Sequence, residues 1–173
     1  MRTQQGAITK AAAMIAACLT LASLSFTGSE AKARQTNENG ASSRAEIAAF
    51  NKKYIAAHLR MDNAAVMSMW AEDGISLLPA TDPIIGKEAI GKFMDEVMGR
   101  TPGYHMRRMD VDFQGIEVSG NWASEWAEEH QVVQPPPGKR VLDSYGKLLL
   151  VLHREADGNW RITREMWNQG MKP

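Results

Sequence analysis

Two stretches near the C-terminal end place carboxylate, imidazole and indole groups at alternating positions. Trp126, Glu128 and His130 are two residues apart, and so are Glu165 and Trp167. In an extended strand, residues two apart point to the same face. A carboxylate and an imidazole that share an apolar pocket have shifted pKa values and can act as general base and general acid. These spacings indicate acid–base chemistry, provided that each strand turns this face toward the interior.

The same side chains also have structural interpretations. Glu128 and His130 could lie on a solvated strand edge, and Glu165 could simply pair with Arg161, Arg164 or Lys147. A shift of one residue in register would turn the whole set to solvent. Both interpretations stay open at the level of the sequence.

Other common catalytic signatures are missing from the sequence. Its four histidines show no spacing typical of metal ligands, and it contains no glycine-rich phosphate loop, nucleophile elbow or triad motif. The single cysteine, Cys18, lies in the N-terminal apolar stretch. We therefore expect no metal site and no cofactor.

Charge and length limit the class of protein. The 173 residues carry 20 Lys and Arg against 20 Asp and Glu. A nucleic-acid-binding protein needs a basic face, so this balance argues against nucleic acid as a partner. The length fits one domain in addition to any processed segment.

The first 33 residues have the pattern of a cleaved signal peptide. Arg2 and Lys10 precede an uncharged apolar run over residues 11–26, and Ala31 and Ala33 form a small-residue cleavage site. The run is too short for a membrane-spanning helix. We expect an exported protein, periplasmic or secreted, with a flexible polar lead-in at 34–42 and one domain at 43–173.

Cys18 offers an alternative to simple cleavage. The stretch Ile15–Cys18 loosely resembles a bacterial lipobox, which would anchor the mature protein to a membrane by a lipid. Leu19, Leu21 and Leu24 continue the apolar run past the cysteine, and this favours cleavage after Ala33. A membrane is expected as a partner only if Cys18 is lipidated.

Hydrophobic periodicity predicts helices followed by a sheet. Ser43 and Glu46 form a capping box for a helix that runs to about Arg60, and Asp62 can cap a short helix that carries Trp70. A short strand at 75–78 and a helix at 87–98 follow. Four long strands are then expected at 105–118, 122–133, 140–154 and 160–168. This order predicts an α+β cone-shaped fold, with three helices packed on a curved, mainly antiparallel sheet that encloses a pocket.

Several landmarks along residues 43–170 resemble a known superfamily. The N-terminal half resembles ketosteroid-isomerase-like and SnoaL-like domains of the nuclear-transport-factor-2-like (NTF2-like) superfamily, and the C-terminal half is similar to its SgcJ/EcaC-type branch, whose function is unknown. The residues that carry the resemblance are Tyr54–Ile55, Trp70–Asp73, Pro79, Gly86–Ile90, Tyr145–Leu148, Arg154, Asp157–Ile162 and Trp167–Asn168. The resemblance implies the cone-shaped fold, which hosts isomerases, cyclases, dehydratases and binding modules alike.

The resemblance also bears on the site. It implies that Tyr54 occupies the position of the isomerases' oxyanion-binding tyrosine and that Trp126 points inward. The isomerases' catalytic base falls on Leu78, and their second oxyanion donor falls on Leu150. Without a carboxylate at either position, we do not expect steroid isomerisation by that route.

Two function classes follow. The first is a non-catalytic pocket for a small apolar or aromatic molecule, lined by Trp70, Leu78, Trp126, Leu150 and Trp167. The second is a cofactor-independent acid–base enzyme of the isomerase, cyclase or dehydratase type. In that enzyme the catalytic residues would be Glu128, His130, Glu165 and Tyr54.

A homodimer is also expected. Strand alternation assigns Ala123, Ala127, Leu149 and Val151 to the outer face of the sheet. Such a face is apolar enough to need covering.

Overall fold

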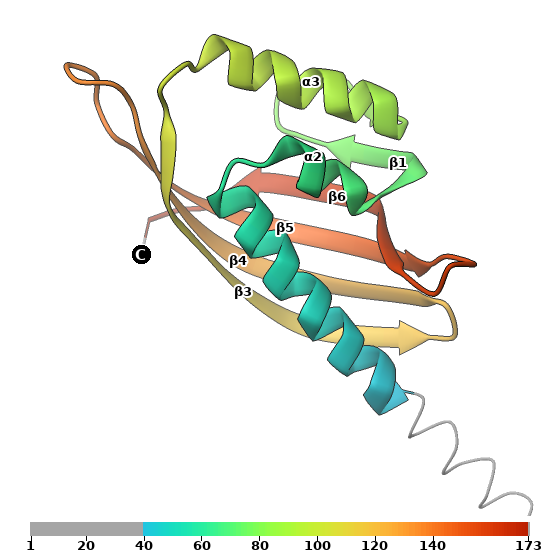
Figure 1. Cartoon of the computed structure of the whole chain (residues 1–173). Helices are drawn as coiled ribbons and strands as arrows, with labels where there is room; N and C mark the ends of the chain where they lie inside the picture. Colours follow the sequence, from blue (N-terminus) through green and yellow to red (C-terminus); the bar gives the residue numbers. More distant parts are fainter. Residues whose placement is uncertain (1–39, 173) are drawn as a thin grey trace, which may run out of the picture. The chain divides into compact units, whose positions relative to one another are not determined.

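A six-stranded sheet with the order β2-β1-β6-β5-β4-β3 organises the structure, a computed structural model that describes residues 40–172 (Figure 1). Residues Ser43–Pro173 form one compact unit. The proposed signal peptide with Cys18, and most of the lead-in, lie outside the described residues.

The strands agree closely with the alternation in the sequence. Each of the four predicted long strands is present, with ends within two residues of the prediction. Neighbouring strands pair antiparallel except β1 and β6, which are parallel. The strands are β1 (Trp70–Leu77), β2 (Ile84–Ile85), β3 (His105–Ser119), β4 (Trp122–Gln134), β5 (Leu142–Arg154) and β6 (Trp160–Gln169).

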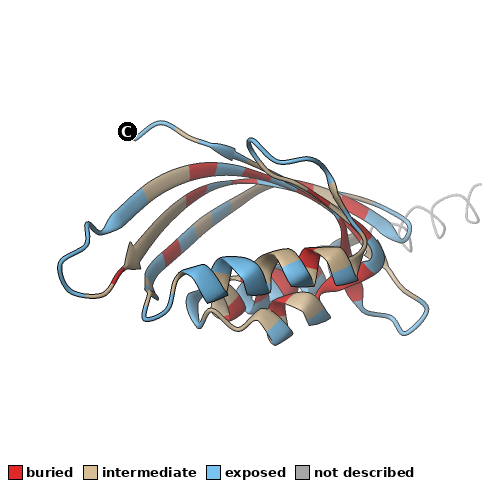
Figure 2. Ribbon diagram, turned by 90° about the horizontal axis from the view of Figure 1, so that it is seen from above, coloured by how far each residue is buried: buried red, intermediate tan, exposed pale blue. Residues whose placement is uncertain are grey.

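Three helices cover the concave face of the sheet, which arches over them in Figure 2. The N-terminal helix spans residues 40–59, α2 spans Asn63–Ser68 and α3 spans Lys87–Arg100. The predicted cap of α2 is confirmed, because Asp62 Oδ1 accepts a hydrogen bond from the backbone N of Ala65 at 3.0 Å. The α+β fold with helices on a curved, mainly antiparallel sheet is thus confirmed.

Three element boundaries differ from the prediction. The N-terminal helix already includes residues 40–42, so Ser43 does not begin it, and α3 continues through Gly99 to Arg100. Trp70, expected on the second helix, is the first residue of β1. It pairs with Ile162 of β6, whose backbone N donates to Met69 O at 2.8 Å. This parallel pairing outweighs the helical spacing of the apolar side chains around Trp70.

The core lies between the helices and the concave face. Tyr54, Ile47 and Phe50 of the N-terminal helix are buried against the sheet. The sheet contributes mainly aliphatic side chains, namely Ala127, Leu148, Leu150, Leu152 and Ile162. Since burial of each such side chain contributes about 1.5–3 kcal/mol, this contact fixes the helix on the sheet.

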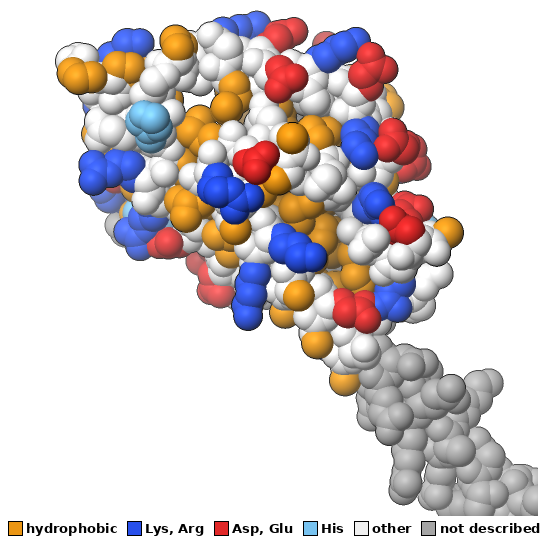
Figure 3. Space-filling model, in the orientation of Figure 1, with side chains coloured by type: hydrophobic (Ala, Val, Ile, Leu, Met, Phe, Trp, Pro, Cys, Tyr) orange, Lys and Arg blue, Asp and Glu red, His pale blue; other side chains and the backbone are white. Residues whose placement is uncertain are grey.

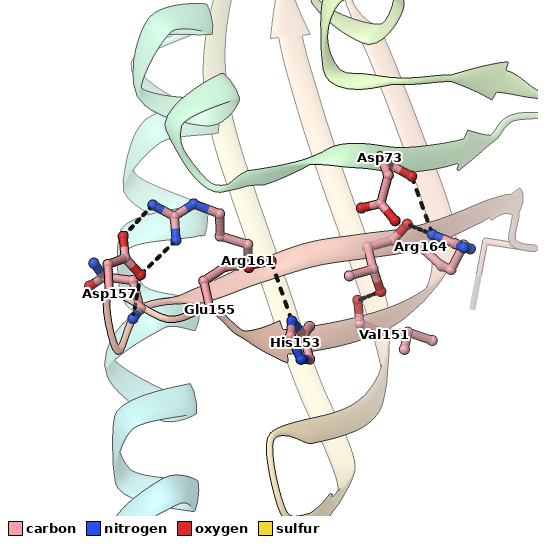
Figure 4. A network of polar contacts seen from close by, with 9 residues as sticks. Asp73, Val151, His153, Glu155, Asp157, Arg161 and Arg164 are labelled. Atoms are coloured by element: carbon pink, nitrogen blue, oxygen red, sulfur yellow. Dashed lines mark hydrogen bonds and ion pairs between the residues drawn. The ribbon is translucent and has the colours of Figure 1, made fainter.

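Polar contacts hold the turn between β5 and β6 and join β6 to β1 (Figure 4). Asp157 accepts hydrogen bonds from Arg161 Nη1 and Nη2 at 3.0 and 2.7 Å and from the backbone N of Asn159. These donors hold the pKa of Asp157 below its usual range. Arg164 Nη1 donates to the backbone O of Asp73 in β1 at 3.4 Å. Asp73 thus lies within β1, and the Arg164 side chain links its backbone to β6 where the pairing of the two strands shifts register.

Within residues 40–172 no helix is both long and apolar enough to cross a membrane.

Candidate functional site

The concave face carries three glutamates that the strands bring close together. Glu125 and Glu129 come from β4, and Glu165 comes from β6. Leu150 of β5 pairs with Glu125 on one side and with Glu165 on the other, so the two carboxylates flank a fully buried leucine. Three acidic side chains therefore share the interior side of the sheet.

Glu165 lines a cavity of about 330 Å³ between the helices and the sheet. Ser76 Oγ donates to Glu165 Oε1 at 3.5 Å. Burial raises the pKa of Glu165 to about 7, with a further contribution from the negative charge of Glu129. A carboxyl group with this pKa can either donate or accept a proton near neutral pH.

The cavity walls are mainly apolar, and hydrophobic side chains are visible between α3 and the N-terminal helix in Figure 3. Four methionines contribute flexible side chains that can adapt to a ligand. No lysine or arginine among the described residues lines the cavity. The walls are Met61, Val66, Trp70, Leu78, Ile90, Phe93, Met94, Val97, Met98 and Met106, with His58, Asn63, Ser76, Gln131 and Glu165 as the polar members.

His58 contributes a neutral imidazole to the cavity. Burial lowers the pKa of His58, so the ring is uncharged near neutral pH. Its Nδ1 lies 2.9 Å from the backbone O of Tyr54. A carbonyl only accepts, so Nδ1 carries the hydrogen and Nε2 is left as an acceptor.

Tyr54 lies beside His58 in the core. The ring centroids of the two side chains are 4.1 Å apart, and Phe113 meets the tyrosine ring edge-on at 6.1 Å. Burial raises the pKa of Tyr54 well above its ordinary value, and the charge of Glu165 adds to this effect. The tyrosine therefore stays protonated and can act as a hydrogen-bond donor but not as a base.

Glu129 lies behind the cavity and is held by neutral donors. Trp167 Nε1 donates to Glu129 Oε1 at 3.0 Å, and Gln131 Nε2 donates to the same oxygen. The indole can reach across β5 because Gly146 has no side chain, and a Cβ there would lie 2.3 Å from Trp167 Nε1. Burial raises the pKa of Glu129, and the two donors act against this rise.

The predicted orientation of β4 is wrong by one residue. Trp126 is 44 % exposed and Glu128 is exposed, and both lie on the convex face with His130. The reason is the β3–β4 hairpin, which pairs Val118 with Ala123 and so directs Ala123 and every second residue after it inward. The interior glutamates of β4 are therefore Glu125 and Glu129, not Glu128.

His130 has its own partners on the convex face. Its Nε2 lies 2.8 Å from Asp143 Oδ1, and its ring stacks on Tyr145 with the centroids 4.2 Å apart. The structure therefore does not bring His130 and Glu128 together with Glu165. Tyr54 and Glu165 are the two predicted catalytic candidates on the interior side.

The predicted ligand-binding residues fall into three groups. Trp70 and Leu78 line the cavity. Leu150 and Trp167 lie on the concave face, where Leu150 is fully buried and Trp167 is partly buried. Trp126 lies on the convex face, away from the cavity.

Glu125, Glu129 and His58 were not predicted from the sequence as functional residues. A signal for the two glutamates existed, because the short turn at Gly120 fixes which residues of β3 and β4 lie opposite each other. His58 lies four residues after Tyr54 and so on the same side of the helix.

No group of three or more His, Cys, Asp or Glu side chains in the described part of the chain has a geometry that could hold a metal ion. Within the site, Glu165 can exchange a proton near neutral pH, the neutral His58 can accept a hydrogen bond, and Tyr54 can donate one.

Comparison with known families assigns the domain. The SnoaL-like domain family matches residues 40–165, which include every element from the N-terminal helix to the centre of β6. The chain belongs to the SnoaL-like domain family. Among curated proteins, none matches the chain significantly.

Solved structures share the NTF2-like fold of this SnoaL-like domain. A ketosteroid isomerase-like protein from Erwinia carotovora atroseptica matches with a TM-score of 0.64 and 21 % identity, over 75 % of this chain and 96 % of that one. A protein of the NTF2-like family from Streptomyces avermitilis matches with a TM-score of 0.63 and 16 % identity, over 73 % and 96 % of the two chains. A Catenulispora acidiphila protein solved in complex with S-DNPA matches with a TM-score of 0.61 and 20 % identity, over 75 % and 94 %. At these identities the likeness concerns the fold.

Proposed function

We propose that this SnoaL-like domain binds a small apolar or aromatic molecule in the cavity next to α3, with the polar end of the ligand at Glu165. The observation that carries the proposal is a cavity of about 330 Å³ with apolar walls and a carboxyl group that no lysine or arginine of the wall neutralises. A cavity of this size lies in the range of small-molecule sites, which combine apolar walls with a few placed polar groups.

The position of Glu165 supports ligand binding. Burying an ionisable group without an opposite charge lowers stability, and a purely structural carboxyl would be expected to have strong partners. The hydroxyl of Ser76, at 3.5 Å, is a weak one. The polar group of a ligand could supply the stronger hydrogen bond.

The test is ligand capture combined with a variant that fills the cavity. Native mass spectrometry of the protein from its own host should show a small molecule retained by the wild type. Met94→Trp should abolish retention because Met94 lines the cavity. Met171→Trp is the matched control, since Met171 is 92 % exposed and should retain the ligand. Retention by the Met94→Trp variant would refute binding in this cavity.

A second candidate function is acid–base catalysis, and the properties of Glu165 favour it. With a pKa of about 7, this carboxyl could shuttle a proton on a carbonyl-containing ligand bound in the cavity. Glu165 lies on the strand next to Leu150, the position at which the resemblance would place a second donor.

Deuterium exchange would separate catalysis from simple binding. The captured ligand, incubated with the protein in deuterated water, should gain deuterium at the carbon next to its carbonyl, or convert to a product. Glu165→Gln should stop this exchange, and Glu128→Gln on the convex face should leave it unchanged. Binding without exchange in the wild type would exclude the catalytic alternative for that ligand.

We infer that the protein is exported to the periplasm or secreted, on the basis of the signal-peptide pattern of residues 1–33. We also infer that it falls in the SgcJ/EcaC-type branch of its superfamily, on the C-terminal landmarks from Tyr145 to Asn168. Mass measurement of the N-terminal peptide would check export. A mature chain that begins at Arg34 would support cleavage after Ala33. A mature chain that begins at a lipid-modified Cys18 would show that the protein is a lipoprotein instead.

A further inference from the structure

The cavity has a one-sided charge environment. Ser76 of β1 donates to Glu165, Tyr54 and Glu129 interact with it electrostatically, and His58 lines the same cavity. Both aromatic groups are neutral near pH 7, because burial raises the pKa of Tyr54 and lowers the pKa of His58. The side chains that α3 contributes to the cavity carry no charge. Among the described residues, these groups therefore contribute only negative charge to the surroundings of Glu165.

We infer that the ligand of this cavity is an apolar or aromatic amine whose ammonium group pairs with the carboxylate of Glu165. The inference rests on the proposed binding function and adds the charge of the ligand to it. A buried carboxylate is stable when an opposite charge compensates it, and here the protein wall offers none. The ligand would supply the missing cation.

The walls suit a cation as well as an apolar body. Trp70 and Phe93 present aromatic rings to the cavity, and ring faces attract cations. Methionine sulfurs are polarisable and pack against rings and alkyl chains. Glu129 strengthens the negative potential while its own carboxylate is already held by Trp167 and Gln131. An anionic ligand would meet Glu165 and Glu129 with no cation to offset them.

Three probes with the same skeleton and different head groups test the ligand charge. They are phenethylamine, phenethyl alcohol and phenylacetate, measured by isothermal titration calorimetry on the full mature domain. At about pH 8, where Glu165 is largely ionised, the amine should bind roughly tenfold or more tightly than the alcohol, and phenylacetate should bind most weakly.

The pH dependence has a defined sign. Because an ammonium group stabilises the ionised carboxylate, amine binding should lower the pKa of Glu165 and release a proton below about pH 7. The affinity of the amine should therefore rise with pH up to about 7 and then level off, while that of the alcohol should not rise. Calorimetry in two buffers of different ionisation enthalpy measures the proton release.

Two Glu→Gln variants complete the test. Glu165→Gln should remove the preference for the amine and keep binding of the alcohol, since the amide is similar in size and uncharged. Glu125→Gln is the matched control: Glu125 is buried but does not line the cavity, so the preference should persist. Equal affinities for amine and alcohol, or a preference that survives in Glu165→Gln, would overturn the inference while the binding function stands. Failure of all three probes to bind would count against both proposals.

Discussion

At the residue scale, Glu125 is a buried acid with an amide as its partner. It is 1 % exposed, and Asn51 Nδ2 donates to its Oε2 at 2.8 Å. The other oxygens of the pair, Glu125 Oε1 and Asn51 Oδ1, have no hydrogen-bond partner among the described residues. A protonated carboxyl supplies the O–H donor that such a pair lacks, and burial raises the pKa of Glu125 to about 7. Glu125 is therefore a neutral acid over much of the acidic range.

This pairing makes stability depend on pH in a predictable direction. The carboxyl pKa is higher in the folded state than the ordinary value of 4.5, so the folded state binds the proton more tightly. The contribution of Glu125 to the free energy of unfolding should be largest below pH 4.5 and should decrease as the pH rises to about 7. The loss is on the order of 3 kcal/mol, at about 1.4 kcal/mol for each unit of pKa difference.

Glu125→Gln should remove this part of the pH dependence and raise the melting temperature at alkaline pH relative to the wild type. Urea unfolding at a series of pH values measures the pH dependence, and thermal unfolding at alkaline pH measures the melting temperature. Glu128→Gln is the control, because Glu128 is exposed and should leave the pH profile unchanged. A profile for Glu125→Gln with the wild-type slope would mean that Glu125 is already ionised in the folded protein.

At the element scale, a bulge in β3 changes which of its side chains face the interior before the hairpin that orients β4. The pairing shifts register between Gln114 and Glu117, and Gly115 has a φ of 60° there. Inward side chains of β3 change from odd positions, such as Phe113, to even positions, such as Val118. The sequence shows this change as a shift in the apolar pattern around Gly115, so it was available as a signal.

The elements themselves could be predicted, because each long strand alternates and is bounded by turn residues. The residues of β4 alone do not show which of its two faces points to the interior. Tryptophans at 122 and 126 suggest one interior face, while the true interior positions 123 and 127 hold small alanines. Only the pairing with β3 shows which face of β4 is interior, because a shift of one residue in register exchanges the two faces of the strand. The predicted candidates carried by the N-terminal helix and by β6, Tyr54 and Glu165, therefore lie on the interior side, whereas Glu128 and His130 of β4 lie on the convex face.

Gly115→Ala tests the bulge. The positive φ disfavours alanine, and the new Cβ would lie 2.8 Å from Trp126 Nε1. We expect a loss of about 1–2 kcal/mol in the free energy of unfolding. Adding Trp126→Ala should recover the part that comes from the clash, so the double variant should be more stable than the sum of the single effects. If the effects of the two substitutions on the free energy of unfolding were strictly additive, the Trp126 indole would not contact a side chain introduced at position 115.

At the scale of the whole molecule, the convex face of the sheet is bare of other elements in the described part of the chain (Figure 2). Its apolar residues differ from the predicted set, because Ala123 and Ala127 are buried on the concave face. Its exposed hydrophobic side chains cluster over β4 to β6, namely Trp122, Trp126, Leu149 and Met166. An apolar patch of this kind indicates an interaction surface.

Charged side chains lie next to this patch on the same face. Asp110 and Asp112 of β3 pair with His130 and Glu128 and are exposed on the convex side. Lys147 of β5 lies opposite Glu128, and Arg164 of β6 lies opposite Val151. Because acidic and basic groups are mixed here, the apolar patch is the feature that favours pairing.

We propose that two copies pair through this convex face, and Leu149→Arg tests the pairing. Leu149 is 42 % exposed at the centre of the patch, so an arginine there would bury an unpaired charge at the interface. Sedimentation at micromolar concentration should give a dimer for the wild type and a monomer for the variant.

Leu59→Arg is the matched control, since Leu59 is 43 % exposed on the N-terminal helix and should leave the dimer intact. A monomeric wild type at this concentration would contradict the proposal, and dissociation by both variants would place the interface elsewhere.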